Sequence, residues 1–419
     1  MAIEKIKIKN FKSFKELELD LGKFNVLIGA NASGKSNFVE IFRFLKNITE
    51  YGLENAISME GGVEFLRNIN IGSSENFSLS IVSNETFPWP IFNRREFSRR
   101  KRIIINKITY EFALEFAKKG TKFKIAEDKT TYRYTLEEEE NKKRDEGKFT
   151  ISSIKGKLNL ENFESKNGIL KESEVLPINF IEHFLKPDRP NKILLEGSHF
   201  PIIGVPEYLL GDISIYDFDP KMSKQPAQIT GKTDLEENGS NLSIVLKNIL
   251  DDKEESRKFF NLITNILPFV EKLDIDKIWE RSLLFELKET YSSKKFLPAS
   301  FLSDGTINIS ALIVALYFGK KSSRSHLTII EEPERNIHPY LISKMINMMK
   351  DASSKKQIIV TTHNPEVIKH VGKENILLVS RDKEGFSKIS KPAEKEEIKT
   401  FLQNEIGIEE LYVQNLLEF

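Results

Sequence analysis

A short stretch between an apolar run and a helical pattern has the residue types and spacing of a phosphate-binding loop. The stretch GANASGKS, residues 29–36, fits the pattern G-x-x-x-x-G-K-[ST]. Glycines in such a loop let backbone N–H groups turn inward around a phosphate, and the next helix adds positive potential. We expect Lys35 to bridge the β- and γ-phosphates of ATP and the Ser36 hydroxyl to ligate Mg²⁺. The predicted nucleotide-binding residues here are Gly29, Ala30, Asn31, Ala32, Ser33, Gly34, Lys35, Ser36 and Asn37.

Two adjacent acids follow a second apolar run, in TIIEEPE. Parallel α/β sheets place their ligands at the carboxyl ends of strands, where Glu331 and Glu332 are expected. Glu331 would hold Mg²⁺, directly or through water, and Glu332 would act as general base toward the attacking water. In isolation, the same acids could equally cap the following helix. The phosphate loop favours the catalytic interpretation.

Two further polar groups complete the candidate site. His363 ends the apolar strand in IIVTTHNP, where a neutral imidazole could contact the γ-phosphate or the attacking water, although a lone histidine is more often structural. Ser303 and Gly305 lie in LSDGT, before a helix that is apolar on nearly every side. Ser-Asp-Gly at a helix start is also ordinary capping. The other motifs favour function at both places.

The pattern of elements predicts an α/β fold. Strands are expected over residues 3–8, 15–28, 326–330 and 357–362, and helices over residues 307–318 and 339–350. Phe38, Ile41, Phe42, Leu45 and Ile48 form one helical face that ends near Gly52. Residues 78–136 resemble an antiparallel meander, and 135–148 is a charge run predicted as a solvated loop. Helices are also predicted near 240–250, 254–266 and 394–404. The predicted domains are 1–134 and 296–419, two halves of an ATPase head, around a partly helical insert, 135–295.

Composition limits the classes of function. The 63 basic and 62 acidic residues of the 419-residue chain nearly cancel, so any nucleic-acid surface must be local. The absence of cysteine excludes disulfides, thiolate metal sites and cysteine nucleophiles. The alternating start of the chain does not resemble a signal peptide, and no run of eighteen apolar residues occurs. A cytoplasmic protein without membrane contact is predicted.

The motifs NFKSF, GANASGKSN, LSDGT, EEPE and TTH occur in this order. Their combination resembles the Walker A, signature, Walker B and switch-histidine motifs of ABC-type ATPases related to SMC, RecF and OLD proteins. YDFDP, LEENGSNL, EEPERNIHP and the tail EIGIEELYVQNLL are similar to stand-alone OLD-like AAA ATPases of bacteria and archaea. That group is often encoded beside a nuclease or toxin-like partner in phage defence.

This resemblance implies a homodimer with ATP at the interface. Ser303 and Gly305 of one subunit would contact the γ-phosphate held by Lys35 of the other, and ATP turnover would switch a partner effector protein. The alternative is a RecF-like DNA-repair ATPase that binds DNA directly; a transporter ATPase subunit is less favoured. The chain departs from the family pattern at Glu331, where aspartate is more usual, and at Asp304, where a small residue is. No glutamine stands between Ser36 and Gln225, so Gln225, Gln228 or another polar residue would replace the Q-loop glutamine.

Three other features are interpreted more simply. The basic cluster at 94–102 could grip a phosphate backbone or form a solvated hairpin surface. Glu334 and His338 have the spacing of a metal pair but lack a third ligand, which favours a polar helix start. Met345, Met348 and Met349 are predicted to lie in the core.

Overall fold

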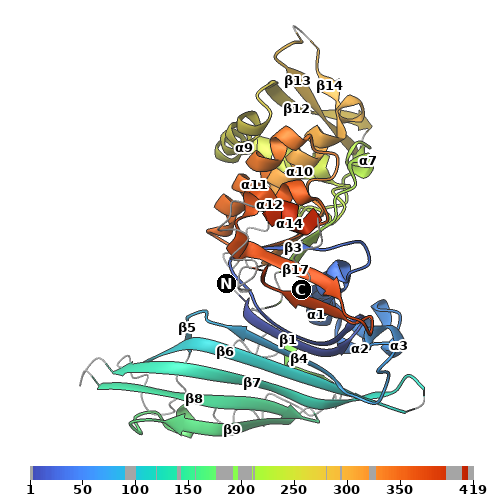
Figure 1. Cartoon of the computed structure of the whole chain (residues 1–419). Helices are drawn as coiled ribbons and strands as arrows, with labels where there is room; N and C mark the ends of the chain where they lie inside the picture. The colour runs from blue at the N-terminus through green and yellow to red at the C-terminus, as the bar shows by residue number, and fades with distance from the viewer. Residues whose placement is uncertain are drawn as a thin grey trace. The chain divides into compact units, whose positions relative to one another are not determined.

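The computed structural model describes residues 3–89, 101–118, 120–138, 143–155, 157–175, 192–196, 210, 213–279, 281–292, 295–319, 327–392 and 408–413. The chain forms two compact units, each built from segments distant in sequence (Figure 1). Unit 1 comprises residues 1–22, 36–213 and 381–389, and unit 2 comprises residues 23–35, 214–380 and 390–419. The three segments predicted along the sequence, with boundaries at 134 and 295, stay a prediction.

Unit 1 is built on an eight-stranded sheet of antiparallel pairs, with the order β2-β1-β4-β6-β7-β8-β9 and with β5 beside β6 (Figure 1). Its strands are β1 (Ile3–Phe11), β2 (Phe14–Asp20), β4 (Phe77–Ser83), β5 (Phe87–Trp89), β6 (Lys101–Phe116), β7 (Phe123–Glu138), β8 (Lys143–Ile154) and β9 (Lys157–Ser165). Along β4 buried and half-buried residues alternate, as expected for a sheet with one covered face. The antiparallel meander predicted from residue 78 onward is thereby confirmed.

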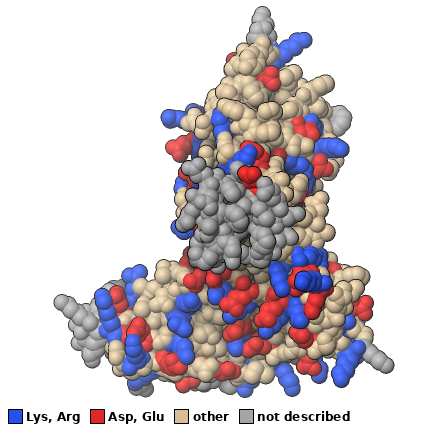
Figure 2. All heavy atoms as spheres, in the orientation of Figure 1, with Lys and Arg blue, Asp and Glu red and all other residues tan. Residues whose placement is uncertain are grey.

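Charged side chains of both signs cover the exposed face of this sheet, where blue and red atoms are interspersed (Figure 2). Cross-strand ion pairs join neighbouring strands: Lys5 Nζ lies 3.0 Å from a Glu18 oxygen and Lys9 Nζ lies 2.9 Å from a Glu16 oxygen. Exposed ion pairs of this kind contribute little to the free energy of unfolding. Because each pair joins opposite charges, the pairs create no electrostatic field of a single sign on this face. The face drawn in Figure 2 therefore agrees with the near-zero net charge of the chain.

Helix α1 (Lys35–Tyr51) starts where the predicted phosphate loop ends. All members of its predicted apolar face are buried: Phe38, Ile41, Phe42, Leu45 and Ile48. Phe44 packs against Phe11 and Phe77 of the sheet, with ring centroids 6.3 and 5.9 Å apart. Gly52 follows the helix with φ of 85°, the left-handed region that glycine favours. Unit 1 also contains α2 (Leu53–Met59), α3 (Val63–Leu66), α4 (Glu172–Val175), the 3₁₀-helix η1 (Leu194–Glu196) and β18 (Ser387–Ser390).

The charge run 135–148 differs from the prediction of a loop. Its described residues belong to β7 and β8, with Thr135 opposite Glu146 and Leu136 opposite Asp145. The charged residues favour a solvated loop because one face of each strand is exposed. The opposite face, which carries the fully buried Leu136, is not exposed. The strands β7 and β8 of unit 1 thus include the described residues of this segment.

Unit 2 contains a sheet in which β15, β16, β3 and β17 pair in parallel, in the order β10-β15-β16-β3-β17. Its strands are β3 (Phe24–Ile28), β10 (Ile213–Tyr216), β15 (Leu327–Glu331), β16 (Gln357–Thr362) and β17 (Ile376–Arg381). Every residue of β3 is buried, which explains its continuous apolar sequence. The predicted bounds of β16 are confirmed, and β15 lies within one residue of its prediction. Together with the antiparallel sheet and the helices, this arrangement confirms the predicted α/β fold.

Helices and a small sheet complete unit 2 (Figure 1). They are α7 (Pro220–Ser223), α8 (Leu242–Asp251), α9 (Lys253–Ile266), α10 (Asp304–Tyr317), α11 (Pro339–Ser353), α12 (Pro365–Val371), α14 (Ile408–Val413), β11 (Ala227–Gln228), β12 (Val270–Trp279), β13 (Ser282–Glu289), β14 (Leu297–Pro298), η2 (Ala299–Phe301) and η3 (Lys373–Asn375). Helix α10 is buried continuously from Thr306 to Leu316, and the three methionines of α11 lie in the core, as predicted. The predicted helix at 394–404 lies outside the described residues. In the part of the chain that the structure describes, no helix is both long and apolar enough to cross a membrane.

Candidate functional site

Most predicted site residues belong to unit 2 and gather at one edge of its parallel sheet. Glu331 lies opposite Thr361 in the register of β15 and β16, and Thr362 lies opposite Ile28 in the register of β16 and β3. The residues that follow these three strands are therefore neighbours, although they come from distant parts of the sequence. They are Glu332, His363 and the loop that begins at Gly29.

The loop after β3 has the backbone of a tight cradle. Ala32 and Gly34 adopt φ of 62° and 117°, so the chain turns sharply before α1. Successive turns of this kind point backbone N–H groups into a concave, anion-binding surface. A Cβ on Gly29 would lie 2.2 Å from Val379 O of β17. Glycine is therefore required at this position because the neighbouring strand passes too close for any side chain.

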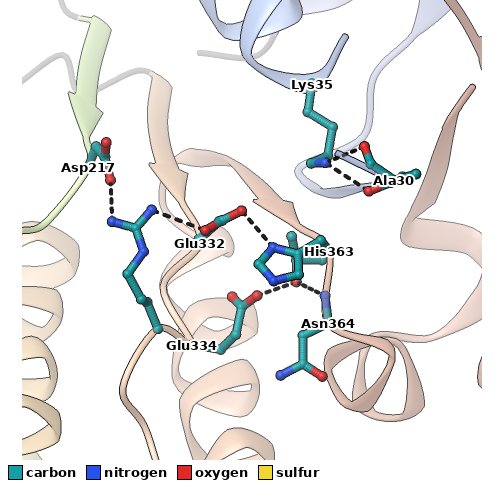
Figure 3. Close-up of polar contacts among 10 residues, drawn as sticks. Ala30, Lys35, Asp217, Glu332, Glu334, His363 and Asn364 are labelled. Carbon is teal, nitrogen blue, oxygen red and sulfur yellow. Dashed lines mark hydrogen bonds and ion pairs between the residues drawn. The ribbon is translucent and has the colours of Figure 1, made fainter. Parts of the chain in front are cut away.

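Lys35 lies at the end of this loop with 8% of its surface exposed. Its Nζ donates to Gly29 O at 2.8 Å and to Ala30 O at 3.0 Å (Figure 3). Burial lowers the pKa of this ammonium, and the carboxylates of Glu332, Glu334 and Glu331 partly offset that effect. Among the described residues, both direct partners are uncharged carbonyls, and an ammonium has three donors. A donor and a positive charge are left for an anion.

Glu332 is held from several directions. Its φ of 44° is in the left-handed region, which is unusual for a residue with a side chain, and its N–H donates to Thr361 O at 2.9 Å. One carboxylate oxygen, Oε1, lies 2.7 Å from His363 Nδ1 (Figure 3). The other, Oε2, accepts from Arg335 Nη2 at 3.0 Å. Backbone and side chain thus fix one orientation of this carboxylate.

These contacts also keep Glu332 ionised. Partial burial acts to raise the pKa of the Glu332 carboxyl, but the hydrogen bonds from His363 and Arg335 outweigh it and hold the pKa below its ordinary value. Glu332 is therefore negatively charged at neutral pH. A carboxylate must be ionised to accept a proton, so the charge state suits the role predicted for it.

Glu334 was interpreted from the sequence as part of a polar helix start, but its side chain is buried. With 6% of the residue exposed, its Oε1 accepts a hydrogen bond from Thr362 Oγ1, and that hydroxyl accepts from Asn364 N at 3.0 Å (Figure 3). Burial is the main cause of a raised pKa at Glu334. This carboxyl joins the turn after β15 to the end of β16, the two segments that carry Glu332 and His363.

Arg335 and Asp217 were not predicted as site residues. Asp217 follows β10, and its Oδ1 accepts from Arg335 Nη1 at 3.1 Å, so one guanidinium bridges Asp217 and Glu332 (Figure 3). The sequence signal for Arg335 was its position three residues after Glu332, close enough for a side-chain contact in a turn. Asp217 lies in the YDFDP motif, but that motif does not indicate its partner, because the neighbourhood of Asp217 depends on β10 lying beside β15.

Ser303 is exposed at the start of α10. Its hydroxyl accepts from Thr306 N at 3.1 Å, which makes Ser303 the N-cap of the helix. A Cβ on Gly305 would lie 2.9 Å from Asn336 O, so the start of α10 packs closely on the turn that follows Arg335. Asp304 forms an ion pair with Lys224. The Ser303 hydroxyl also lies 2.9 Å from Thr306 Oγ1, with which it shares a second hydrogen bond. The residue is nevertheless exposed to solvent.

The remaining residues predicted to bind Mg²⁺ or nucleotide, or to replace the Q-loop glutamine, lie in different elements. Glu331 is half-buried at the end of β15, and Ser36 is exposed in the first turn of α1. Asn37, in unit 1, donates through Nδ2 to Ser13 Oγ at 2.7 Å. Gln225 follows α7, and Gln228 pairs with Ser282 in the small sheet.

Two features that were discounted from the sequence can also be located. His338 is the N-cap of α11, where its Nδ1 accepts from Tyr340 N. Most of the basic cluster at 94–102 lies outside the described residues. Within the described ranges, no group of three or more His, Asp or Glu side chains could hold a metal ion by itself.

Comparison with known proteins gives a family. A family model described as "AAA domain, putative AbiEii toxin, Type IV TA system" matches residues 24–369, which include β3, the loop after it and His363. A stretch of 46 residues is 52% identical to the chromosome partition protein Smc of Methanocaldococcus jannaschii. That stretch is 11% of this chain and spans only 4% of the length of the relative.

Solved structures give more distant resemblances. An Smc head bound to the C-winged helix domain of ScpA is 16% identical, with a TM-score of 0.48, and the match covers 93% of this chain and 98% of that one. An SMC head domain from Thermotoga maritima is 12% identical, with a TM-score of 0.43. This match covers 93% of this chain and 99% of that one.

Proposed function

The chain belongs to the AAA domain family whose model matches residues 24–369, and we propose that it binds ATP with Mg²⁺ and hydrolyses it. One observation carries the proposal. The buried Lys35 ammonium and the Glu332–His363 pair follow neighbouring strands of one parallel sheet, at the edge where such sheets bind ligands. This arrangement supports Lys35 as the cation for phosphate and Glu332 as the base for water.

The loop of residues 29–35 would hold the phosphates. Its turns at Ala32 and Gly34 and the start of α1 direct N–H groups toward an anion, and Lys35 has a donor left for phosphate oxygens. Gly29 keeps β17 close to the loop. The residues present therefore fit the phosphates of a nucleoside triphosphate.

Ser36 and Glu331 would hold Mg²⁺. Both offer oxygen ligands, the kind that Mg²⁺ prefers, and this ion usually takes only one or two protein ligands beside water and phosphate. When bound, Mg²⁺ neutralises charge on the β- and γ-phosphate oxygens. Two oxygen donors that flank the Lys35 loop and the Glu332 turn are enough for such a site.

Glu332 would act as general base. As water attacks the γ-phosphorus, the bond from this phosphorus to the bridging oxygen breaks, ADP leaves, and Glu332 accepts the proton that the water loses. His363 orients the carboxylate through its 2.7 Å contact. The positive φ of Glu332 and its bond to Thr361 O add to this preorganisation, which is a main source of catalytic power.

The active form would be a homodimer. Ser303 and Gly305 stand at an exposed helix start, where the signature motif of one subunit would meet ATP bound by the other. ATP binding would close this dimer, and hydrolysis would reopen it to switch an effector protein. The family description names a putative toxin of a type IV toxin–antitoxin system, which supports a toxin-like partner. The role in phage defence is what the motif resemblance implies. Stimulation of ATP turnover by DNA would instead favour a RecF-like repair ATPase.

The test measures ATP turnover by purified variants. Glu332→Gln keeps the shape of the side chain but cannot take the proton, so turnover should fall roughly 100-fold or more while ATP binding persists. Lys35→Ala should remove binding itself. Glu271→Gln and Lys288→Ala, which break an exposed ion pair between β12 and β13, are matched controls and should retain full turnover. Normal turnover in Glu332→Gln or Lys35→Ala would refute the assignment.

A further inference from the structure

One short segment touches both halves of the candidate site. Asp217, at its start, accepts from Arg335, which in turn donates to Glu332. Lys224, at its end, forms an ion pair with Asp304, the residue next to Ser303. We name residues 217–224 the strap. One end of the strap contacts the turn that carries the predicted base, and the other contacts the start of α10.

The strap is fastened along its length. Asp217 N donates to Glu237 O at 3.0 Å, and Asp219 N donates to Asn238 O at 3.1 Å. Asp219 also caps α7, where its side chain accepts from Lys221 N at 3.0 Å. These bonds attach the front half of the strap to the turn at 236–241.

The back half of the strap is fixed as well. Ser223 Oγ donates to Gly239 O at 2.7 Å, and a Cβ on Gly239 would lie 2.7 Å from that hydroxyl. Phe218 is buried and stacks on Tyr216, with ring centroids 5.3 Å apart. Because a short segment held by hydrogen bonds and by a buried aromatic ring does not deform freely, we expect a displacement at one end of the strap to reach the other.

We propose that the strap couples the start of α10 to Glu332, so that engagement of Ser303 by a second subunit sets the orientation of the base in its own subunit. This inference rests on the proposed ATPase function and adds its regulation. Within one chain, Ser303 would serve the ATP of the partner, while Glu332 serves the ATP of its own loop. A link between them makes each active site sensitive to whether the other is occupied.

Arg335 is the positioning residue through which the strap acts. Its guanidinium is shared by two carboxylates, Asp217 and Glu332. An arginine paired with Glu332 alone would move together with that carboxylate. The second contact, with Asp217, instead fixes the guanidinium to the strap. A small misplacement of a catalytic group can cost up to ~100-fold in rate, so control of the position of Glu332 is control of turnover.

A double-mutant cycle on turnover tests the coupling. Asp217→Asn and Lys224→Gln should each lower kcat about 10-fold with KM for ATP unchanged, because neither side chain contacts the phosphate loop. If the strap links its ends, the double variant should be no slower than the slower single variant. Lys224→Arg keeps the charge and should restore kcat. Lys247→Gln breaks an exposed pair in α8, with 2.5 Å between Lys247 Nζ and Asp251, and should have no effect.

A second measurement does not depend on ATP. Hydrogen–deuterium exchange of the backbone amides at residues 304–310 should rise about threefold or more in Asp217→Asn, at the far end of the strap, and not in Lys247→Gln. That result would support the strap even if turnover proved independent of Lys35, which would refute only the ATPase proposal. Unchanged exchange at 304–310, or single losses in kcat that multiply in the double variant, would overturn the coupling.

Discussion

His363 Nδ1 lies 2.7 Å from Glu332 Oε1, and the two residues follow neighbouring parallel strands. The contact joins the predicted base to a residue that is half exposed. A base with a fixed carboxylate acts on water more efficiently than one that rotates, because orientation is established before the reaction begins. The function of His363 can therefore be tested through Glu332.

We predict that His363→Ala lowers kcat by roughly 10- to 100-fold and leaves ATP affinity within a factor of about two. The variant loses the bond to Oε1 but keeps the phosphate loop intact. His370→Ala is the control, since His370 lies on α12 and its Nε2 lies 3.6 Å from a carboxylate oxygen of Glu366. Equal kcat in both variants would remove His363 from the site.

In the proposed dimer, Lys35 of one subunit and Ser303 of the other form one composite site. This arrangement predicts complementation between two inactive proteins. Lys35→Ala should not bind ATP, and Ser303→Arg should bind ATP but block closure sterically. A mixed dimer retains one composite site with an intact Lys35 facing an intact Ser303, so mixing should recover part of the ATPase activity. Full activity of Ser303→Arg alone would mean that the serine serves only as the cap of α10.

Gly29→Ala should abolish nucleotide binding and destabilise the fold. The new Cβ would lie 2.2 Å from Val379 O and 2.7 Å from Ser33 Oγ, so β17 or the loop must move, at about 1–3 kcal/mol or more. Gly319→Ala is the matched control, because the nearest described atom to its Cβ would be Ala315 O at 3.7 Å. Urea unfolding and fluorescent-nucleotide binding measure the two effects. Wild-type binding by Gly29→Ala would contradict the cradle.

From the buried Asp128 carboxyl we predict that the free energy of unfolding of unit 1 falls as pH rises. This carboxyl accepts from Leu194 N at 2.8 Å and Tyr110 Oη at 3.1 Å, and burial raises its pKa from 3.8 to about 7. A raised pKa means that the stabilising contribution is complete below pH ~4 and is lost as pH rises to ~7, by about 1.4 kcal/mol per unit. Above pH 7 the effect levels off. Urea midpoints across this range measure the slope.

Two variants separate this effect from other titrations. Asp128→Asn should remove the slope between pH 4 and 7, because the amide does not titrate. Tyr110→Phe removes a hydrogen bond that favours the charged carboxylate, so the decline should continue to higher pH. An unchanged slope in both variants would show that Asp128 is not its source.

The sequence was sufficient for the parts of the fold and site that depend on local pattern. β16 has its predicted bounds, and the apolar face of α1 is buried, because each follows from residue periodicity alone. The loop at 29–36 and the acids at 331–332 were located because each follows a strand with a continuous apolar sequence. The closeness of Glu332 and His363 required only that these strands be parallel neighbours.

Contacts that depend on strand order could not be predicted in this way. Asp217 meets Arg335 because β10 is the neighbour of β15, and strands distant in sequence carry no local sign of which will be adjacent. The burial of Glu334 could not be predicted for a related reason: its partner, Thr362, ends β16, which is distant in sequence. The charge run at 135–148 was assigned to a loop because composition does not reveal which alternate residues face a core.

Strand β3 is made by the ribosome long before its neighbours in the sheet. It spans residues 24–28, but its partners β16 and β17 are synthesised near the other end of the sequence described here. Pairing across such a separation must first overcome the entropy of closing a long loop, so it comes late in folding. A nascent chain thus carries the complete GANASGKS stretch before the strands that flank β3 have been made. A nucleotide bound at this loop would therefore stabilise the protein only after β16 and β17 have joined β3.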